Sequence, residues 1–399
     1  MDKEADYMSN WKNCTLADLG EIIGGATPST KNESYYGGDI PWITPKDLST
    51  FHGRFICRGE RNITTDGLNT CSARLMPPHS VLFTSRAPIG YVAIAENEIC
   101  TNQGFKSIVP NADTDYLFLY YLLVHNRDRI ENMGSGTTFK EVSGSVMRGI
   151  TVSVPTDIEK QRAIARILGS LDDKIENNAA INHHLEQMAQ AIFKSWFVDF
   201  EPFGGERPID WHIVEFSSFL TLRTEKSNDP TIPLFSVTDT GIYPRGEKFN
   251  KNLSKADTKN KIARETDIVF GMSREILNWG IMRSPIGGVS SAYNVFAVDS
   301  GINSKYLESF IRAHSFYFKD LIRPATREGQ GVDKGALMLK SIYLPPDNVL
   351  FDYYTIEDTL TAQIREKKAE SARLATLRDT LLPHLMSGEL SVANLGSAK

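Results

Sequence analysis

The chain has 399 residues, enough for two or three domains with hydrophobic cores of their own. Its 41% hydrophobic and 23% charged residues are typical of a globular protein, and a membrane-spanning class is excluded because no apolar run approaches ~20 residues. The net charge of −5 argues against a stand-alone nucleic-acid binder, since such proteins usually carry a basic surplus. The four cysteines, Cys14, Cys57, Cys71 and Cys100, form no CxxC pair, so we expect reduced thiols in a cytoplasmic protein.

The first part of the chain, residues 1–155, is predicted to form a mixed α/β globule. In chain order, the expected elements are a buried strand that runs into a Ser-Arg loop (81–90), a second strand (91–99), a short buried helix (113–126), a glycine loop that ends in lysine (134–140) and a strand stopped by proline (147–155).

A long helix is expected in residues 156–206. Thr156 and Glu159 have the spacing of a capping box at its start, and proline and glycine must end it near residues 201–208. Steps of three and four residues trace one stripe along the helix, as in the seam of a coiled coil. The seam positions are Leu168, Leu171, Ile175, Asn178, Asn182, Leu185 and Ile192. Two asparagines therefore stand at the centre of an otherwise apolar seam.

The second half repeats this order. Residues 207–346 hold 19 basic and 15 acidic residues, a net charge of +4, and are the only basic block of the chain. Their expected elements are strands at 268–275 and 293–298, a helix at 303–318, a glycine loop at 329–334 and a strand at 337–345. Residues 347–399 then hold a second long helix that begins around 347–353 and ends near Gly388.

The second helix repeats the seam of the first at a constant offset of 189 residues. Its seam positions are Leu360, Ile364, Lys367, Ser371, Leu374, Leu381 and Leu385. If the helices pair, the asparagines of the first would face Lys367 and Ser371, and such polar seam residues usually fix register at a cost in stability. The pattern allows parallel and antiparallel pairing, and a polar centre that is wet or meets another protein stays an alternative.

Five stretches, in this order and with a degenerate second copy, resemble the specificity (S) subunits of type I restriction–modification systems. They are "SRAPIG" (85–90), "TNQGFK" (101–106), "GTTFKEVS" (136–143), the run from "ITVSVP" to "KIENN" (150–178) and "LEQMAQAIFKSWFVDF" (185–200). The resemblance covers essentially the whole chain, although the second half has "SREILNWG" in place of "SRAPIG" and lacks "NQGF".

The resemblance implies an α+β protein in which two target-recognition domains (1–155 and 207–346) alternate with two conserved helical segments (156–206 and 347–399). The helices would form an antiparallel coiled coil with pseudo-two-fold symmetry that sets the spacing of the domains. About 30 helical residues span roughly 45 Å, comparable to one turn of B-DNA, which suits a bipartite target. The family also implies no catalysis and no cofactor on this chain. Two modification subunits would supply S-adenosylmethionine chemistry, and restriction subunits would join them on double-stranded DNA.

Candidate DNA contacts lie in loops rich in glycine, serine and threonine, where side chains can reach base edges and phosphates. They are Ser85, Arg86, Gln103, Lys106, Thr137, Thr138 and Lys140 in the first globule, and Ser273, Arg274, Arg327, Gln330 and Lys334 in the second. Gln103 is a candidate adenine reader and Arg86 a candidate guanine reader. The alternative for the arginines at 86 and 274 is burial or pairing inside their own domains.

Side chains outside the seam are candidates for the surface that binds the modification subunits. They are Glu159, Gln161, Arg162 and Arg166 near the start of the first helix, and Phe193, Phe197 and Phe200 near its end. An exposed trio of phenylalanines is more than two helices need, which favours a domain or partner contact. A local core under the first globule is an equally available interpretation.

Two other classes of function, an enzyme and a protein-recruiting scaffold, are the alternatives to this hypothesis. An enzyme is not favoured, because no NPPY-type tetrapeptide is present, "GEIIGG" does not match a phosphate loop, and the Glu366–Lys368 stretch of a nuclease-like pattern lies in the heptad helix. No metal site is predicted either, because His183 and His184 point about 100° apart on a helix. The other class is a duplicated scaffold that recruits proteins without any DNA specificity.

Overall fold

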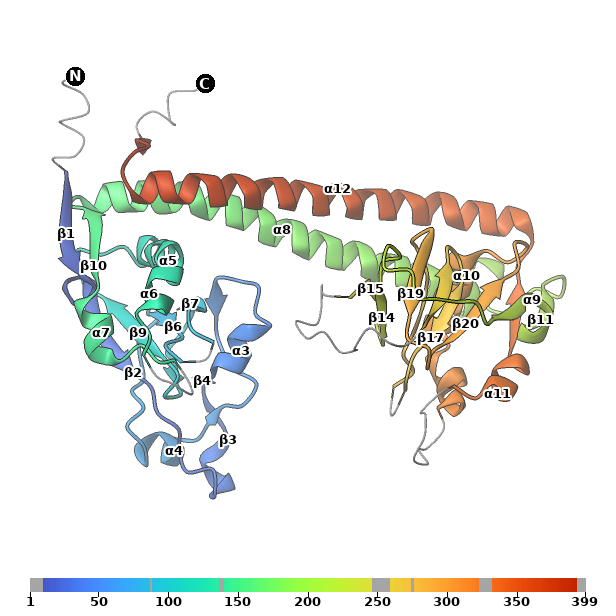
Figure 1. Cartoon of the computed structure of the whole chain (residues 1–399), viewed down its shortest axis with the longest axis horizontal. Coiled ribbons are helices and arrows are strands. Elements are labelled where there is room, and N and C mark those ends of the chain that lie inside the picture. Colours follow the sequence, from blue (N-terminus) through green and yellow to red (C-terminus); the bar gives the residue numbers. More distant parts are fainter. Residues whose placement is uncertain are drawn as a thin grey trace. The chain divides into compact units, whose positions relative to one another are not determined.

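The computed structural model describes residues 10–86, 88–135, 140–245, 259–273, 276–322 and 332–392. The chain divides into two compact units. Unit 1 contains Met1–Asn182 and Arg365–Lys399, and unit 2 contains His183–Ile364. The division passes through both long helices, α8 (Ile158–Phe197) and α12 (Asp347–Met386), so each unit holds one globule and one end of each helix (Figure 1). In the described part of the chain, no helix is long and apolar enough to cross a membrane.

The globule of unit 1 is built on a five-stranded sheet. Its order is β2 (Gly20–Gly24), β9 (Lys106–Pro110), β6 (Val81–Phe83), β7 (Val92–Ala95) and β5 (Phe55–Ile56). Neighbouring strands are antiparallel, except that β5 and β7 are parallel. Beside this sheet, β1 (Trp11–Thr15) pairs with β10 (Thr151–Pro155), and β4 (Trp42–Ile43) pairs with β8 (Cys100–Thr101). The smaller elements are α2 (Leu16–Leu19), η1 (Glu33–Tyr35), β3 (Tyr36–Ile40), α3 (Pro45–Ser49), α4 (Thr65–Asn69), α6 (Arg127–Asn132) and α7 (Gly144–Gly149).

The stretch "YLFLYYLLVH" forms helix α5 (Tyr116–His125) and is apolar on all sides. Asp115 caps it by accepting a hydrogen bond from the Phe118 backbone N–H at 2.8 Å. The helix lies between the sheet and the long helices, and its buried side chains share one core with Val81 of β6, Leu168 of α8 and Leu385 of α12. A helix that is covered on several sides needs apolar residues on each of them.

The globule of unit 2 has a four-stranded sheet with the order β12 (Leu220–Arg223), β20 (Asn294–Val298), β17 (Ile268–Phe270) and β18 (Trp279–Ile281). A three-stranded sheet, β13 (Lys226–Ser227), β16 (Asn260–Arg264) and β19 (Ile286–Val289), and the hairpin β14 (Phe235–Thr238) and β15 (Gly241–Pro244) complete it. β11 (His212–Glu215) pairs with β21 (Ser341–Leu344). The remaining elements are η2 (Glu201–Phe203), α9 (Phe216–Phe219), α10 (Ser304–Ala313), η3 (Ser315–Leu321) and α11 (Lys334–Met338).

The two globules share one strand order. In unit 1 it is β2-β9-β6-β7, and in unit 2 it is β12-β20-β17-β18. Each globule also closes with an antiparallel pair between its first and last strands, in which Trp11 faces Pro155 and His212 faces Leu344. Each predicted strand and helix has a counterpart, but four of the strands are shorter than expected. The strand expected at 91–99 spans only β7, and the one expected at 268–275 spans only β17. The strands expected at 147–155 and 337–345 are reduced to β10 and β21, because the helices α7 and α11 take their first residues.

The ends of the long helices match the expectations only in part. The predicted capping box of Thr156 and Glu159 is wrong, because Asp157 caps α8 and accepts a hydrogen bond from the Glu159 N–H at 2.9 Å. The Thr156 hydroxyl donates instead to the Asn10 carbonyl. α12 ends as predicted, with Gly388 at φ +77°, a left-handed conformation that glycine adopts without strain.

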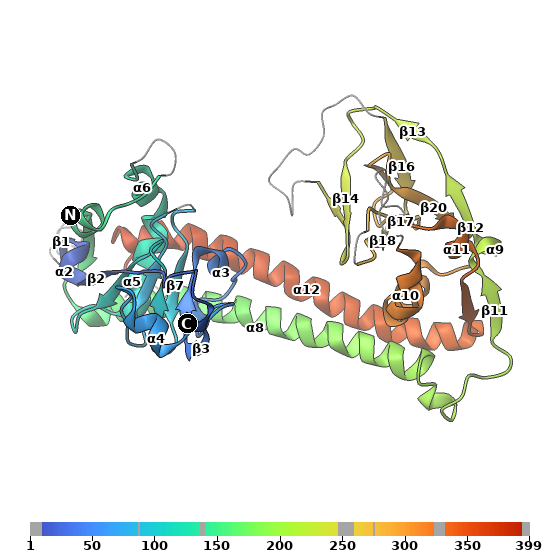
Figure 2. The ribbon, with the colours of Figure 1, turned by 90° about the horizontal axis from the view of Figure 1, so that it is seen from below.

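The two helices run antiparallel within each unit. In unit 1, Asp172 and Asn178 of α8 contact Arg378 and Ser371 of α12, so the residue numbers of the two helices run in opposite directions. Every predicted seam residue is buried or half-buried. In unit 2, α10 lies against the ends of both helices (Figure 2), and its aromatic side chains join those of α8 and α12 in one core.

Candidate nucleic-acid interface and partner surfaces

A polar cleft in unit 1 brings two of the predicted DNA contacts together. It has a volume of about 450 Å³ and is lined by Thr44, Pro45, Lys46, Arg86, Asn102, Gln103 and Gly104. Arg86 and Gln103 are both exposed, and they come from loops that follow β6 and β8. Within the described residues, the Arg86 guanidinium forms no hydrogen bond or ion pair, so the cleft offers an unpaired cation to a ligand.

The turn that carries Gln103 is held by its neighbours. The Asn102 side chain accepts a hydrogen bond from the Gly104 N–H at 2.9 Å, and the Asn102 N–H donates to the Ile43 carbonyl. Ser85 fixes the other side, because both its N–H and its hydroxyl donate to the Gly104 carbonyl. Ser85 is fully buried. Its position supports the loop and is not available for a direct DNA contact.

The other predicted contacts of unit 1 differ in their exposure and in their ion pairs within the protein. Lys106 is mostly buried and lies 3.6 Å from the carboxylate of Glu141. Lys140 is exposed at the edge of the same region. Thr137 and Thr138 lie outside the described residues.

In unit 2, Ser273 is buried and accepts a hydrogen bond from the Asn278 N–H at 2.9 Å, so its role here is structural. Lys334 is exposed in the first turn of α11, next to the capping residue Asp333. Three further predicted contacts, Arg274, Arg327 and Gln330, lie outside the described residues.

Two lysines of unit 2 that are not among the predicted DNA contacts lie near the predicted contact Lys334. Lys226 of β13 and Lys261 of β16 stand directly opposite each other across the strand pair. Burial lowers the pKa of Lys261, and the positive charges of Lys334 and Lys226 lower it further. Like charges that face each other across strands are unfavourable on their own, so this cluster suits a polyanion. No local motif marks it, because strand pairing alone brings the lysines together.

The polar centre of the seam forms a hydrogen-bonded network in unit 1. The Asn178 amide donates to Glu370 at 3.0 Å and to the Ser371 hydroxyl at 3.3 Å. Hydrogen bonds from Lys367 and Asn178 lower the pKa of Glu370. The expected contact between Asn178 and Ser371 is therefore present. Among the described residues, the amide oxygens of Asn178 and Asn182 are buried without a hydrogen-bond partner.

Buried charges attach the globule of unit 1 to the helices. Arg54, only 5% exposed, donates to Asp173 and Glu176 of α8. Burial opposes its charge, but the hydrogen bonds to these carboxylates outweigh it and raise the pKa of Arg54. Nearby, Asp172 accepts a hydrogen bond from the Tyr121 hydroxyl at 2.5 Å and one from Arg378 of α12 at 2.6 Å.

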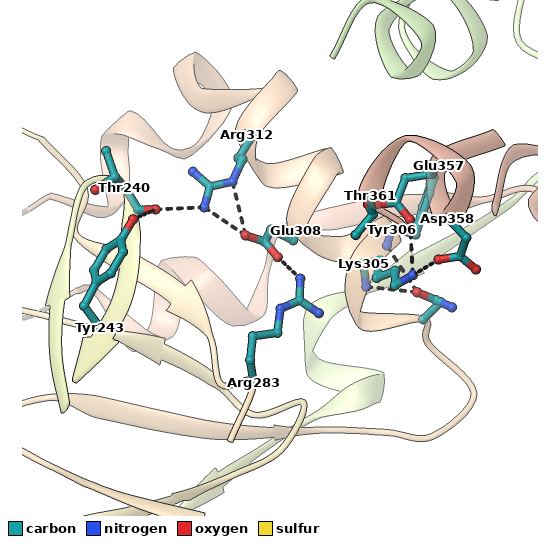
Figure 3. Close-up of polar contacts among 11 residues, drawn as sticks. Thr240, Tyr243, Arg283, Lys305, Tyr306, Glu308, Arg312, Glu357, Asp358 and Thr361 are labelled. Atoms are coloured by element: carbon teal, nitrogen blue, oxygen red, sulfur yellow. Dashed lines mark hydrogen bonds and ion pairs between the residues drawn. The ribbon is translucent and has the colours of Figure 1, made fainter. Parts of the chain in front are cut away.

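Unit 2 combines aromatic packing with polar contacts between α10 and its neighbours (Figure 3). Lys305 of α10 donates to Glu357, at 3.2 Å, and to Asp358 of α12. One turn along α10, Glu308 binds both Arg283 and Arg312. The Arg312 guanidinium lies 5.1 Å from the centre of the Trp279 ring and reaches the Thr240 carbonyl of the β14–β15 turn.

The predicted partner surface on α8 is only partly exposed. Phe193 and Phe197 belong to the core of unit 2, where Phe197 is fully buried, and Phe200 is half-buried beside Trp211. The local-core interpretation therefore describes the first two, although their core belongs to the second globule rather than the first. The residue pattern of α8 does not show which globule covers the end of the helix.

At the start of α8, Gln161 is 2% exposed and ties the helix to its globule through hydrogen bonds with Asp115 and Pro155. It is therefore not a surface residue. Glu159, Arg162 and Arg166 are exposed and remain candidates for a partner contact.

Comparison with known proteins gives this architecture a family. Residues 8–187 match the family described as "Type I restriction modification DNA specificity domain". Over 416 aligned positions the chain is 34% identical to the type I restriction enzyme MjaIX specificity subunit of Methanocaldococcus jannaschii, which covers 97% of this chain and 95% of that protein. The chain belongs to the specificity subunits of type I restriction enzymes.

Other specificity subunits match a smaller share of the chain. The HindI specificity subunit of Haemophilus influenzae is 29% identical over 42% of this chain and 38% of its own length. Among solved structures, the S subunit from M. genitalium has a TM-score of 0.51 at 16% identity and covers 94% of this chain and 96% of its own. A chain from a type I R-M system solved to explain complex assembly and conformational transition has a TM-score of 0.52 at 15% identity, over 96% of this chain and 98% of its own. Both likenesses support the fold, which in the first case is that of an S subunit.

Proposed function

We propose that this chain is the non-catalytic subunit that gives a type I restriction–modification complex its DNA sequence specificity. Each globule reads one half of a bipartite, asymmetric target in double-stranded DNA. In this proposal residues 1–155 and 207–346 are the target-recognition domains. Residues 156–206 and 347–399 are the spacer helices with their linker and tail.

The observation that carries the proposal is the shared strand order of the two globules, each attached to a pair of antiparallel helices. Two similar domains with different loops suit two different half-sites. Each helix has 40 residues and is about 60 Å long, which exceeds one turn of B-DNA. An intramolecular coiled coil of this length, produced by an internal repeat, would act as the spacer between the half-sites.

We infer that DNA is contacted at the cleft of Arg86 and Gln103 in unit 1 and at the lysine cluster of unit 2. The cleft offers donors that can reach base edges, whereas lysines opposite each other favour phosphates. Lys140 and Lys334 are exposed and extend these two surfaces.

The chemistry of the complex would belong to its partners. Two modification subunits, each with S-adenosylmethionine, would methylate the DNA, and restriction subunits would complete the nuclease. The exposed residues Glu159, Arg162 and Arg166 of α8 are our candidates for the modification-subunit surface.

The proposal is tested by co-expressing the chain with its modification subunit and mapping methylated adenines across the genome. One bipartite motif with a fixed gap is expected. In binding assays with the assembled complex, the affinity for DNA should fall steeply as the salt concentration rises. Lys226→Gln should reduce the slope of log affinity against log salt concentration by about one, the value for one phosphate contact, without changing the motif. If no motif forms and binding is indifferent to DNA and salt, the chain is instead a protein-recruiting scaffold.

A further inference from the structure

The carboxamide of Gln103 is held in one orientation by a residue outside the cleft. The Thr27 hydroxyl donates a hydrogen bond to the Gln103 Oε1 atom. Thr27 does not line the cleft, whereas Gln103 does. The oxygen of the amide therefore turns toward Thr27, and its NH₂ group forms no hydrogen bond within the described residues. It stays available as a donor.

The approach of Thr27 to Gln103 is built into the backbone. The Ala26 N–H donates to the Thr101 carbonyl at 3.0 Å, which sets the segment of Thr27 beside the turn that carries Gln103. At Gly25 any side chain would collide with this turn, because a Cβ atom there would lie 2.1 Å from the Asn102 carbonyl oxygen. The turn itself is held by the Asn102 side chain. These backbone contacts hold the Thr27 hydroxyl next to the Gln103 amide in the absence of DNA.

The polar groups of this cleft are mainly donors. Arg86 is unpaired among the described residues, and the two side-chain amide oxygens at this turn are already engaged. Gln103 Oε1 accepts a hydrogen bond from the Thr27 hydroxyl, and Asn102 Oδ1 accepts one from the Gly104 N–H. A surface of donors complements an edge that carries only acceptors, which in the major groove is the N7 and O6 edge of guanine. An adenine edge would also need an acceptor for its N6 amino group.

From this juxtaposition we propose that Thr27 is a positioning residue for base recognition: it turns the Gln103 amide so that this cleft selects guanine in the first half-site. The inference rests on the proposed function, and it changes the expectation from the sequence, in which Gln103 reads adenine. Thr27 acts through Gln103 and needs no DNA contact of its own.

The test compares Thr27→Val, Thr27→Ser and Gln103→Ala in the full chain co-expressed with its modification subunit. Thr151→Val is the matched control, because Thr151 is exposed on β10 and its side chain has no role in the cleft. Mapping of methylated adenines should show Thr27→Val and Gln103→Ala relaxed at the same G·C position by about tenfold, with the second half-site unchanged. Thr27→Ser, which keeps the hydroxyl, should retain the wild-type motif.

Two further measurements separate positioning from folding and from phosphate binding. Binding of the complex to a duplex with 7-deazaguanine at that position should be weakened for the wild type but not for Gln103→Ala. Adding Thr27→Val to Gln103→Ala should change nothing more. Relaxation at an A·T pair, uniform weakening with an intact motif, or a Thr27→Val motif identical to that of Thr151→Val would overturn the inference while the wild-type motif still supports the proposed function. Absence of a wild-type motif would instead remove the proposed function.

Discussion

The two units share a strand order but fix their globules to the helices by different chemistry. In unit 1 the contacts are charged and polar: Arg54 with α8, and Asp172 between Tyr121 and Arg378. In unit 2 the helix ends are held mainly by aromatic rings, with Phe197 5.2 Å from Tyr306 and 5.0 Å from Tyr353. Two globules with the same strand order are therefore attached to the helices by different kinds of contact.

This difference has consequences for stability. An aromatic contact loses stability when a buried ring is removed, because the substitution leaves a cavity. A buried ion pair loses stability when one partner is removed, because the other partner remains as a desolvated charge. The unit in which a substitution acts should therefore determine the kind of damage it causes, and the following changes test this rule.

The largest effect is expected in the aromatic contact of unit 2. Phe197→Ala should lower the free energy of unfolding of unit 2 by about 4 kcal/mol, because the ring is fully buried. Hydrogen exchange resolved for α5 and α10 would report each unit separately, and only α10 should lose protection. The control, Phe351→Ala, removes a ring that is 71% exposed and should have little effect. Equal loss in both units would refute a contact confined to unit 2.

A somewhat smaller loss is expected when the charged contact of unit 1 is broken. Arg378→Met keeps much of the side-chain volume but leaves the Asp172 carboxylate, 8% exposed, without its cation. This change should cost about 3 kcal/mol in unit 1, as measured by urea unfolding. Arg373→Met on an exposed face of α12 is the control. A loss no larger than that of the control would show that the ion pair contributes nothing.

Replacing the two asparagines at the polar centre of the seam should raise the stability of the helix pair. In Asn178→Leu with Asn182→Leu, two buried amide oxygens without partners are removed, and the helix pair of unit 1 should gain about 1–2 kcal/mol. If the asparagines fix register, methylation by the complex should also lose its single gap length. A destabilised double variant would mean that the hydrogen bonds to Glu370 and Ser371 outweigh the buried oxygens.

The smallest effect is a dependence of unit 2 on pH. His314 stacks on Phe310, and burial lowers its pKa below the ordinary 6.5, although the Phe310 carbonyl opposes the shift. Because the unfolded chain takes up the proton first, stability is complete above pH 6.5 and is lost as the pH falls through the lowered pKa. His314→Gln should flatten this loss in unfolding curves between pH 7.5 and 5. An unchanged slope would assign the loss to other groups.

The sequence predicted the elements more fully than their contacts. The periodicity of the seam located α8 and α12 and the offset between them, because apolar residues on the buried face of a helix recur every three or four positions. It could not show that Phe193 and Phe197 enter the core of unit 2, since two of their packing partners, Tyr306 and Tyr353, lie more than 100 residues away. The capping residue of α8 was misplaced by one position because the Thr156 hydroxyl bonds to the carbonyl of Asn10, which lies 146 positions away in the sequence.

The candidate site shows the same limit. Arg86 and Gln103 were found because they lie in recognisable motifs, and the structure places both in one cleft. Their supporting residue Thr27 lies 76 positions away from Gln103. The lysines at 226 and 261 meet only through strand pairing. Neither contact leaves a signal in a single sequence.

The central claim is that two globules read two half-sites across a spacer made by the helices. The most direct measurement is the methylation map of a variant with one heptad inserted into each helix, between Asn182 and His183 and between Ile364 and Arg365. The account predicts that both half-site sequences stay the same while the gap between them grows by about 3 base pairs, since seven helical residues add about 10 Å. An unchanged gap, with both half-sites still methylated, would contradict it.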